Sequence, residues 1–415
     1  MNDVKLYPVV ELMDICYGYR YGWLAGLLEV SDTVVLRPET KLGSAFRRRV
    51  SIKRYLAERC GIPVQVLDGL KIMLDHGIFV NSVDFARIFG VKKSTRSLVE
   101  IYGVLEVDYG LAYDVPSKLH VEIAVEIALS KLLNRPPNSR MLRALHPSMR
   151  VYVEDLANVL VAHVEGDGSL RTSLSTDELK QKLKRRMYRL VRQSMEENTP
   201  PELHDALYAL SGKAVEETVE NLEEQLEFKA GSGSPFTLIP VVQGLFWEHV
   251  WECFEDILDL LVGYRELLVE SGKKYAYIAI GTGGRVLSDR ETKLVNRLMQ
   301  AGVERARGLG VDVKFHLLGW SSPRMARKLR VELIYSSDSL SARRRAVEGR
   351  IYIVEGGRIK LVNVADIDPS TWTCPCPVCR DPKLRHLVLD PSGSRRNDAR
   401  IVHNLWTIKR YVYRR

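Results

Sequence analysis

The sequence lacks three features that would each place the protein in a special class. Its 415 residues contain no apolar run that approaches the ~20 residues of a transmembrane helix. The opening stretch MNDVKLYPVVELMD carries early acidic residues and no small-residue cleavage pattern of a secretory signal. No internal repeat is apparent along the chain. We therefore expect a globular protein of the cytoplasm, with no membrane partner.

Cysteine is also scarce, with six residues in the whole chain, and half of them fall in the segment TWTCPCPVCR. The other three, Cys16, Cys60 and Cys253, are scattered, and we expect them to be buried small residues. Because a protein of the cytoplasm keeps its thiols reduced, disulfide bonds are not expected for the clustered cysteines.

Positive charge is in excess. The formal net charge is +9 and the isoelectric point is about 9.1. Arginine dominates this excess in FRRRVSIKR, KRRMYRLVR, SARRRA and KRYVYRR. Its guanidinium group suits bidentate phosphate contacts, so the charge favours a polyanionic partner, with nucleic acid first.

Short apolar runs alternate with helical patterns along much of the chain. The runs that we predict to be strands are DTVVLRP, IPVQVLD, LKIMLDHG, SLVEIYGVLEVD, FTLIPVVQG, KYAYIAIGTGG, VDVKFHLLG and VELIYSSDS. Continuous apolar runs indicate strands that are covered on both faces, as in a parallel sheet. SVDFARIFG, EHVWECFEDILDLLVGYRELL and ETKLVNRLMQAGVERARGLG have helical apolar spacing. This alternation predicts an α/β fold, either a (β/α) barrel or an open doubly wound sheet.

Polar and small residues follow several of these strands. Asp75 ends KIMLD, Gln243 ends IPVVQ, Gly281 follows YIAI, and Asp338 follows ELIYSS. In a parallel barrel the carboxyl ends of the strands meet at one face, where active sites form. Each residue taken singly could equally be a turn residue or a helix cap.

A long segment from about 118 to 230 interrupts the alternation and is rich in helix formers and charge. Within it, STDELKQKLKRRMYRLVRQ begins with a capping box from Ser175 to Glu178. Its apolar residues fall on one face, and its other face holds Lys180, Lys182, Lys184, Arg185, Arg186, Arg189 and Arg192. This basic amphipathic helix is either a solvated outer face or a contact to a phosphate backbone.

The spacing C-x-C-x2-C of Cys374, Cys376 and Cys379 is typical of a zinc site that needs one more ligand to become tetrahedral. His386 and His403 are both candidates for this fourth ligand on chemical grounds alone. With four protein ligands the site has no open position, so we expect a structural zinc that holds the C-terminal helix against the barrel.

The motifs taken together resemble those of the tRNA-guanine transglycosylases. CPCPVC followed by HN at the start of a C-terminal helix is similar to the zinc signature of that family. The segments LDHGIF, VEIYGVLEVDYGLAYDVPS, IPVVQG, AIGTGG, HLLGWSSPRM and ELIYSSDS are similar to its other motifs and occur in the family's order. They cover most of residues 65 to 415.

The resemblance implies a (β/α)8 TIM barrel with a zinc subdomain after the last strand. The barrel would comprise residues 1–117 and 231–345, interrupted by a basic helical insertion at 118–230 and followed by the zinc subdomain and C-terminal helix at 346–415. It also implies that His403 is the zinc ligand, since its distance of 24 residues from Cys379 (403 − 379) is similar to the family's long gap.

These enzymes exchange a guanine in nucleic acid for a 7-deazaguanine base, and the resemblance assigns roles to individual residues. Asp338 would attack C1′ as the nucleophile and hold the sugar covalently. Asp75 would handle the proton of the purine, and Asp114 would accept from the N–H donors of guanine. Gln243 and the backbone at Gly283 and Gly284 would hold the purine carbonyl, and Phe79 would stack on the purine. The target base has to be flipped or to lie in a loop.

Some features depart from the family pattern. His76 and Gly77 stand where a serine and a glycine are usual, the glycine loop GTGGRV is fuller, and no RNA-binding domain is apparent after His403. The substrate is therefore tRNA, which we favour slightly, or DNA, as in divergent relatives that modify DNA. A non-catalytic, nucleic-acid-binding partner subunit of an active transglycosylase is the third alternative. Members of the family often pair, which leaves a homodimer or a heteromer open.

Overall fold

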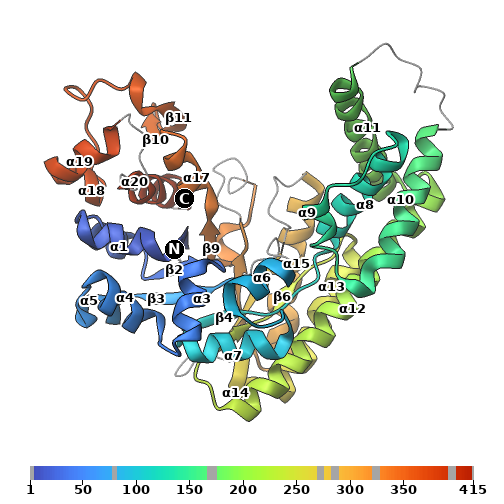
Figure 1. Cartoon of the computed structure of the whole chain (residues 1–415), viewed down its shortest axis with the longest axis horizontal. Coiled ribbons are helices and arrows are strands. Elements are labelled where there is room, and N and C mark those ends of the chain that lie inside the picture. The colour runs from blue at the N-terminus through green and yellow to red at the C-terminus, as the bar shows by residue number, and fades with distance from the viewer. Residues whose placement is uncertain are drawn as a thin grey trace.

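Parallel strands form a nearly closed barrel at the centre of the protein (Figure 1). The computed structural model describes residues 4–76, 82–165, 175–268, 275–281, 289–319, 328–390 and 399–413. The strands of the barrel are β1 (Lys5–Val10), β2 (Thr33–Leu36), β3 (Lys71–Leu74), β4 (Tyr109–Leu111), β5 (Thr237–Ile239), β6 (Val241–Val242), β7 (Tyr275–Ile280), β8 (Asp312–Leu317) and β9 (Ile334–Ser339). They are hydrogen-bonded in the order β5-β4-β3-β2-β1-β9-β8-β7-β6, and each pairing is parallel.

The two ends of this sheet meet at Pro240, the residue between β5 and β6. β5 pairs with β4, and the carbonyl of Ile239 accepts from the N–H of Ala112. β6 pairs with β7, and the carbonyl of Pro240 accepts from the N–H of Ala279. Because proline has no N–H to donate, the ladder is interrupted there and the chain changes its partner strand. One extended segment therefore joins the two edges of the sheet.

Alternate residues of the strands fill the inside of the barrel. The interior cluster consists of Tyr7, Val9, Val35, Met73, Tyr109, Leu111, Ile239, Val241, Tyr277 and Ala279. Their neighbours in the strands, such as Leu6, Ile72 and Ile278, belong to a second core that packs under the surrounding helices. Since both faces of each strand are buried, the strands appear in the sequence as continuous apolar runs.

Helices surround the barrel: α1 (Leu12–Arg20), α2 (Leu24–Val30), α3 (Thr40–Arg47), α4 (Ile52–Cys60), α5 (Val64–Asp68), α6 (Ser82–Phe89), α7 (Thr95–Leu105), α13 (Trp247–Gly263), α14 (Arg265–Leu268), α15 (Asp289–Gly308) and α17 (Leu340–Val347). The three segments predicted to be helical from their spacing fall in α6, α13 with α14, and α15. Among these helices and those described below, none is long and apolar enough to span a membrane.

Two of the predicted strands are wrong. SLVEIYGVLEVD lies mostly in helix α7, which starts with a capping box from Ser94 to Ser97. Its buried residues include Leu98, Ile101 and Leu105, which lie on one helical face. IPVQVLD forms the short helix α5, in which Val64 is exposed. β-branched residues and short length favoured strands here, and the packing of one helical face overrides that preference.

A helical region between β4 and β5 comprises α8 (Ser117–Leu132), α9 (Ser139–Leu142), η1 (Pro147–Met149), α10 (Arg150–Glu165), α11 (Thr176–Glu197) and α12 (Pro201–Ser232). It corresponds to the long insertion expected at 118–230 and has a core of its own. The predicted capping box of Ser175 and Glu178 starts α11. α8, α10 and α11 lie together away from the barrel, in the upper right of Figure 1.

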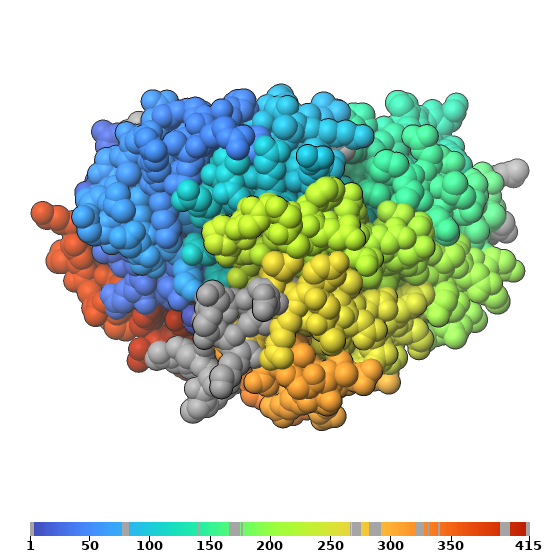
Figure 2. Space-filling view, turned by 90° about the horizontal axis from the view of Figure 1, so that it is seen from below, coloured from blue at the N-terminus to red at the C-terminus, as the bar shows by residue number. Residues whose placement is uncertain are grey.

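Helix α12 connects the helical region to the barrel. It has 32 residues and would therefore extend about 48 Å along its axis. Leu203, Leu207 and Leu210 pack in the core of the helical region, whereas Leu222 and Leu226 pack in the core around the barrel. Seen from below, α12 crosses the middle of the surface between the first and second parts of the barrel (Figure 2). The helical region is thereby fixed to the barrel by a continuous helix.

The C-terminal region follows β9 and α17. An antiparallel hairpin of β10 (Arg350–Glu355) and β11 (Arg358–Asn363) is followed by η3 (Val364–Asp366), α18 (Pro377–Arg380), α19 (Pro382–Leu389), α20 (Ala399–Ile408) and the π-helical turn η5 (Lys409–Tyr413). Of these elements, β10, β11, α18, α19 and α20 lie above α1 in Figure 1. The expectation that His403 opens the last helix is wrong, because α20 begins at Ala399.

A disulfide bond joins Cys16 in α1 to Cys60 at the end of α4. The expectation that both are unlinked buried residues is therefore wrong. Packing of α1 against α4 brings their Cα atoms to 5.4 Å, within the range that a disulfide bond requires. Cys253 is free and buried, as expected.

Candidate active site and metal centre

Three carboxylates converge at the carboxyl ends of the barrel strands. Asp75 directly follows β3, Asp114 follows β4 by three residues, and Asp338 is the next-to-last residue of β9. Parallel strands place all of these positions at the same end of the barrel. The fold thus brings together three acidic side chains that are far apart in the sequence.

Two cations lie among these carboxylates. The Nε atom of Arg37, which directly follows β2, is 3.5 Å from Oδ2 of Asp75. The same guanidinium favours the ionised form of Asp338, whereas the charge of Asp75 opposes it. Burial lowers the pKa of Lys93 to about 8, although the charges of Asp75 and Asp114 counteract this effect. Asp75 therefore lies near Arg37 together with Asp338, and near Lys93 together with Asp114.

Asp338 is deeply buried, with 3% of its surface exposed. Burial raises the pKa of its carboxyl group to about 6, against the opposing effects of the Gly319 N–H and of Arg37. The backbone N–H of Gly319 donates a hydrogen bond to Oδ1, and Nε2 of His316 lies 3.8 Å from the same oxygen. The carboxylate is fixed in position and is ionised above a pH of about 6.

His316 is the next-to-last residue of β8 and is fully buried. Burial lowers its pKa to about 3, so the imidazole is neutral near pH 7. Its Nδ1 is hydrogen-bonded to Oγ of Ser336 at 2.9 Å, and its ring stacks on Tyr7. No hydrogen-bond partner for Nε2 is present among the described residues. The ring is therefore held rigidly with one polar atom near the Asp338 carboxylate.

Asp114 forms a buried pair with His76. Nε2 of His76 is 2.8 Å from Oδ1 of Asp114, and the two residues are 2% and 3% exposed. Oδ2 of Asp114 is buried without a hydrogen-bond partner in the described part of the chain. It would lie 3.7 Å from a Cβ atom at Gly281, so the absence of a side chain there leaves space next to this oxygen. An unpaired buried acceptor of this kind is costly unless a ligand supplies the donor.

A pocket adjoins Asp114 at this end of the barrel. Its lining includes Gln243 and Gly281 from the strand ends, and Met195 from α11. Gln243 is already engaged, because Oε1 accepts from the N–H and Oγ of Ser117, and Nε2 donates to Thr218. Its contact with a purine remains a prediction and would require a change of partner. Gly283, Gly284 and Phe79 lie outside the described residues.

Several polar residues of this cluster had no assigned role in the sequence. Arg37 follows an apolar strand in TVVLRPE, the same signal that identified Asp75, and could have been found in this way. His316 is a single histidine within an apolar strand, a pattern that usually indicates packing. Lys93 precedes α7 in the loop VKKS and gives no signal of its own. His76 was noted only as a departure from the family motif.

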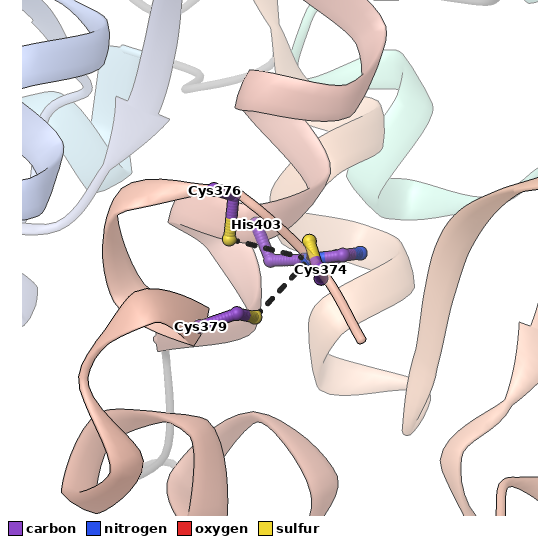
Figure 3. A group of neighbouring side chains, drawn as sticks. All are labelled: Cys374, Cys376, Cys379 and His403. Atoms are coloured by element: carbon purple, nitrogen blue, oxygen red, sulfur yellow. Dashed lines mark hydrogen bonds between the residues drawn. The ribbon is translucent and has the colours of Figure 1, made fainter. Parts of the chain in front are cut away.

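The predicted metal ligands come together in the C-terminal region. Nδ1 of His403 is 3.4 Å from Sγ of Cys374, 3.5 Å from that of Cys376 and 3.6 Å from that of Cys379. All four ligand atoms lie within 4.8 Å of one another. Figure 3 shows the three sulfur atoms around the His403 ring. His386 in α19 is exposed and does not belong to the group, which resolves the choice between the two histidines.

The geometry fits a tetrahedral ion of the size of zinc. Zinc bonds of about 2.3 Å to sulfur and 2.0–2.1 Å to nitrogen, at the tetrahedral angle, place sulfur and nitrogen about 3.6 Å apart. The observed separations of 3.4 to 3.6 Å agree with this value. Nε2 of His403 lies 2.8 Å from the carbonyl of Tyr352 in β10, the kind of second contact that orients a ligand ring. The cluster could therefore hold a metal ion.

Local structure sets the spacing of the cysteines. Cys376 precedes the short helix α18, and its carbonyl accepts from the N–H of Cys379. This turn brings two sulfur atoms to the same side within four residues. The neighbour of His403, Asn404, accepts from the N–H of Tyr352 and donates to the carbonyls of Ala342 and Arg350. These bonds fix α20 against β10 and α17.

No family model matches the sequence, and no curated protein matches it.

Proposed function

We propose that the protein is a guanine transglycosylase that exchanges a guanine in nucleic acid for a 7-deazaguanine, with tRNA slightly favoured over DNA. The observation that carries this proposal is the convergence of Asp75, Asp114 and Asp338, with Arg37 and Lys93 among them, at the carboxyl ends of the parallel strands. The resemblance of the sequence motifs supports the same reaction class. The proposed reaction gives each of the three carboxylates a separate task.

In the first half of the reaction, a carboxylate oxygen of Asp338 forms a bond to C1′ of the target nucleotide. The bond from C1′ to N9 breaks, and its electron pair leaves with the guanine, which takes up a proton donated by the Asp75 carboxyl group. In the second half, the incoming base loses a proton to Asp75, its nitrogen attacks C1′, and the Asp338 carboxylate is released. Each half breaks one bond at C1′ and forms another, so the polymer backbone stays intact.

The buried position of Asp338 suits a nucleophile. Removal from water weakens the solvation of its carboxylate, and the bond from the Gly319 N–H keeps it oriented. His316 is neutral near pH 7, so its ring neither places a positive charge beside the Asp338 carboxylate nor carries an extra proton that could neutralise it. With a pKa of about 6, the group is still ionised at neutral pH.

Asp114 is proposed to recognise the guanine edge. Guanine presents N–H donors at N1 and at the exocyclic amine, and the unpaired Oδ2 of Asp114 is an acceptor. His76 holds the other oxygen and thereby fixes the carboxylate. The space left at Gly281 would admit a planar base to this oxygen.

The barrel is proposed to be of the (β/α)8 type, with β5 and β6 counting as one strand interrupted at Pro240. The metal is proposed to be a structural zinc, because the cluster contains four protein ligands and is largely buried. When bound, it would tie the segment around α18 to α20 and take no part in the exchange.

A direct test is incorporation of radiolabelled guanine by the purified protein into bulk tRNA and into duplex DNA, measured side by side. We expect incorporation into one polymer, loss of it in Asp338→Asn, and full activity in the control Asp312→Asn, an exposed carboxylate at the start of β8. Incorporation into neither polymer by a protein that holds its zinc would instead support the non-catalytic partner subunit.

A further inference from the structure

Helix α11 presents a row of basic side chains to the solvent. Lys182, Arg185, Arg189 and Arg192 are all exposed and follow one another at intervals of three or four residues. This interval places them on one side of the helix. We call these four residues the basic stripe. From Lys182 to Arg192 the stripe extends about 15 Å along the helix axis.

The charges of the basic stripe are not neutralised within the described part of the chain. None of its four residues makes a hydrogen bond or an ion pair with a described residue, whereas Arg186 of the same helix donates to the carbonyl of His163. The neighbouring helix α12 exposes mostly acidic residues, among them Glu202, Asp205, Glu216, Glu220, Glu223 and Glu227. Positive charge is thus concentrated on α11 and is not a general property of the helical region.

The basic stripe begins next to the candidate active site. Met195 of α11 lines the pocket that contains Asp114 and Gln243. Arg192 lies one helical turn before Met195, and Lys182 lies about 20 Å from it along the helix axis. The stripe therefore runs from the neighbourhood of the pocket toward the N-terminus of α11.

We infer that the basic stripe binds the sugar–phosphate backbone of the nucleic acid whose target base enters the pocket. This inference rests on the proposed function and adds to it the surface that holds the polymer. Guanidinium groups bind phosphate oxygens in a bidentate manner, and a row of them on a helix face can follow several consecutive phosphates. Such contacts carry no base preference, so the stripe would supply affinity and orientation and leave base selection to the pocket.

The test compares two variants of the full-length protein that remove the same number of positive charges. The stripe variant is R185Q/R189Q/R192Q, and the control variant is R59Q/R265Q/R307Q. The control arginines are exposed and unpaired in the described part of the chain, and they lie in helices α4, α14 and α15. These helices come before the barrel strands β3, β7 and β8 in the chain. The control arginines therefore lie toward the end of the barrel opposite the candidate active site. Fluorescein-labelled tRNA and a fluorescein-labelled DNA duplex are the probes, with anisotropy as the readout.

We expect the stripe variant to bind the preferred polymer on the order of 10²-fold more weakly at 50 mM salt, and the control variant to bind like the wild type. Each phosphate contact adds roughly 0.7 to 0.9 to the slope of log affinity against log salt. Loss of three contacts should therefore lower that slope by about 2 to 3. The rate of exchange at saturating polymer should change little, because the stripe does not touch the reacting atoms.

Equal affinity and equal salt dependence of the two variants would overturn the inference about the basic stripe. If the wild type still catalysed base exchange in that case, the proposed function would stand. Absence of any binding or exchange by the wild type would instead refute the proposed function itself. Binding of the wild type, but not of the stripe variant, to vesicles of phosphatidylglycerol without binding to either polynucleotide would also overturn the inference, in favour of an anionic membrane surface.

Discussion

Replacement of Asp338 by asparagine is expected to stabilise the fold while it abolishes base exchange. Burial raises the pKa of this carboxyl group from 3.8 to about 6. The folded protein therefore binds this proton more tightly than the unfolded chain does. The stability that the group contributes is fully present below pH 3.8 and is lost as the pH rises through about 6. This shift corresponds to about 3 kcal/mol at neutral pH.

Asparagine is neutral at every pH, and its amide oxygen can still accept the hydrogen bond from Gly319. The free energy of unfolding of Asp338→Asn should thus exceed that of the wild type by up to about 3 kcal/mol at pH 7.5. The difference should disappear well below pH 3.8, where the Asp338 carboxyl group is protonated in both the folded protein and the unfolded chain. Urea-induced unfolding at the two pH values measures it, with the exposed Asp312→Asn as the matched control. A variant that is equally or less stable than the wild type at pH 7.5 would refute the idea that a buried, destabilising carboxylate sits at this site.

Three further predictions concern the nucleophile, the disulfide bond and the metal. The rate kcat/KM for exchange should rise about tenfold per pH unit up to a pH of about 6 and then level off, because the attacking carboxylate has to lose its proton; a flat profile from pH 4.5 to 8 would contradict this role. The Cys16–Cys60 bond closes a loop of 44 residues, and its replacement by two serines should lower the free energy of unfolding by about 4 kcal/mol in urea, whereas unchanged stability would count against it. Cys379→Ser should abolish the bound zinc seen by elemental analysis and increase hydrogen exchange in β10 and α20 while the barrel strands stay protected; retention of a full equivalent of zinc would exclude Cys379 as a ligand.

The sequence was sufficient to predict the strand-end carboxylates because their positions follow from a simple rule of parallel sheets. Where the apolar run is a barrel strand, a polar residue directly after it lies at the carboxyl end of the barrel, and Asp75 and Asp338 are identified in this way. His316 cannot be recognised in the same manner, since its importance depends on the distance of its ring from Asp338 in the neighbouring strand.

Local spacing was also sufficient for three of the four metal ligands. Cys374, Cys376 and Cys379 are close in sequence, and a short turn is enough to bring their sulfur atoms together. The identity of the fourth ligand depends on tertiary packing, because it is the docking of α20 against β10 that brings His403, and not His386, to the three cysteines. The Cys16–Cys60 bond was not predicted for the same reason, because it depends on the packing of α1 against α4.

The errors in the predicted fold lie in segments whose apolar residues fit both the pattern of a strand and the pattern of a helix. SLVEIYGVLEVD contains β-branched residues typical of a strand, yet its buried positions also recur with helical spacing. The true strand β4 follows it and has only three residues, Tyr109–Leu111. So short a strand gives no periodicity that a sequence can reveal, although two of its residues, Tyr109 and Leu111, fill the barrel interior.

The most direct test of covalent exchange at Asp338 is to trap the intermediate. The purified protein is incubated with the preferred polynucleotide without an incoming base, denatured, digested with protease and nuclease, and analysed by mass spectrometry. We predict a nucleotide adduct on the peptide that contains Asp338, and no adduct in Asp338→Asn. Base exchange at the normal rate with an adduct on another carboxylate, or with none, would contradict the account.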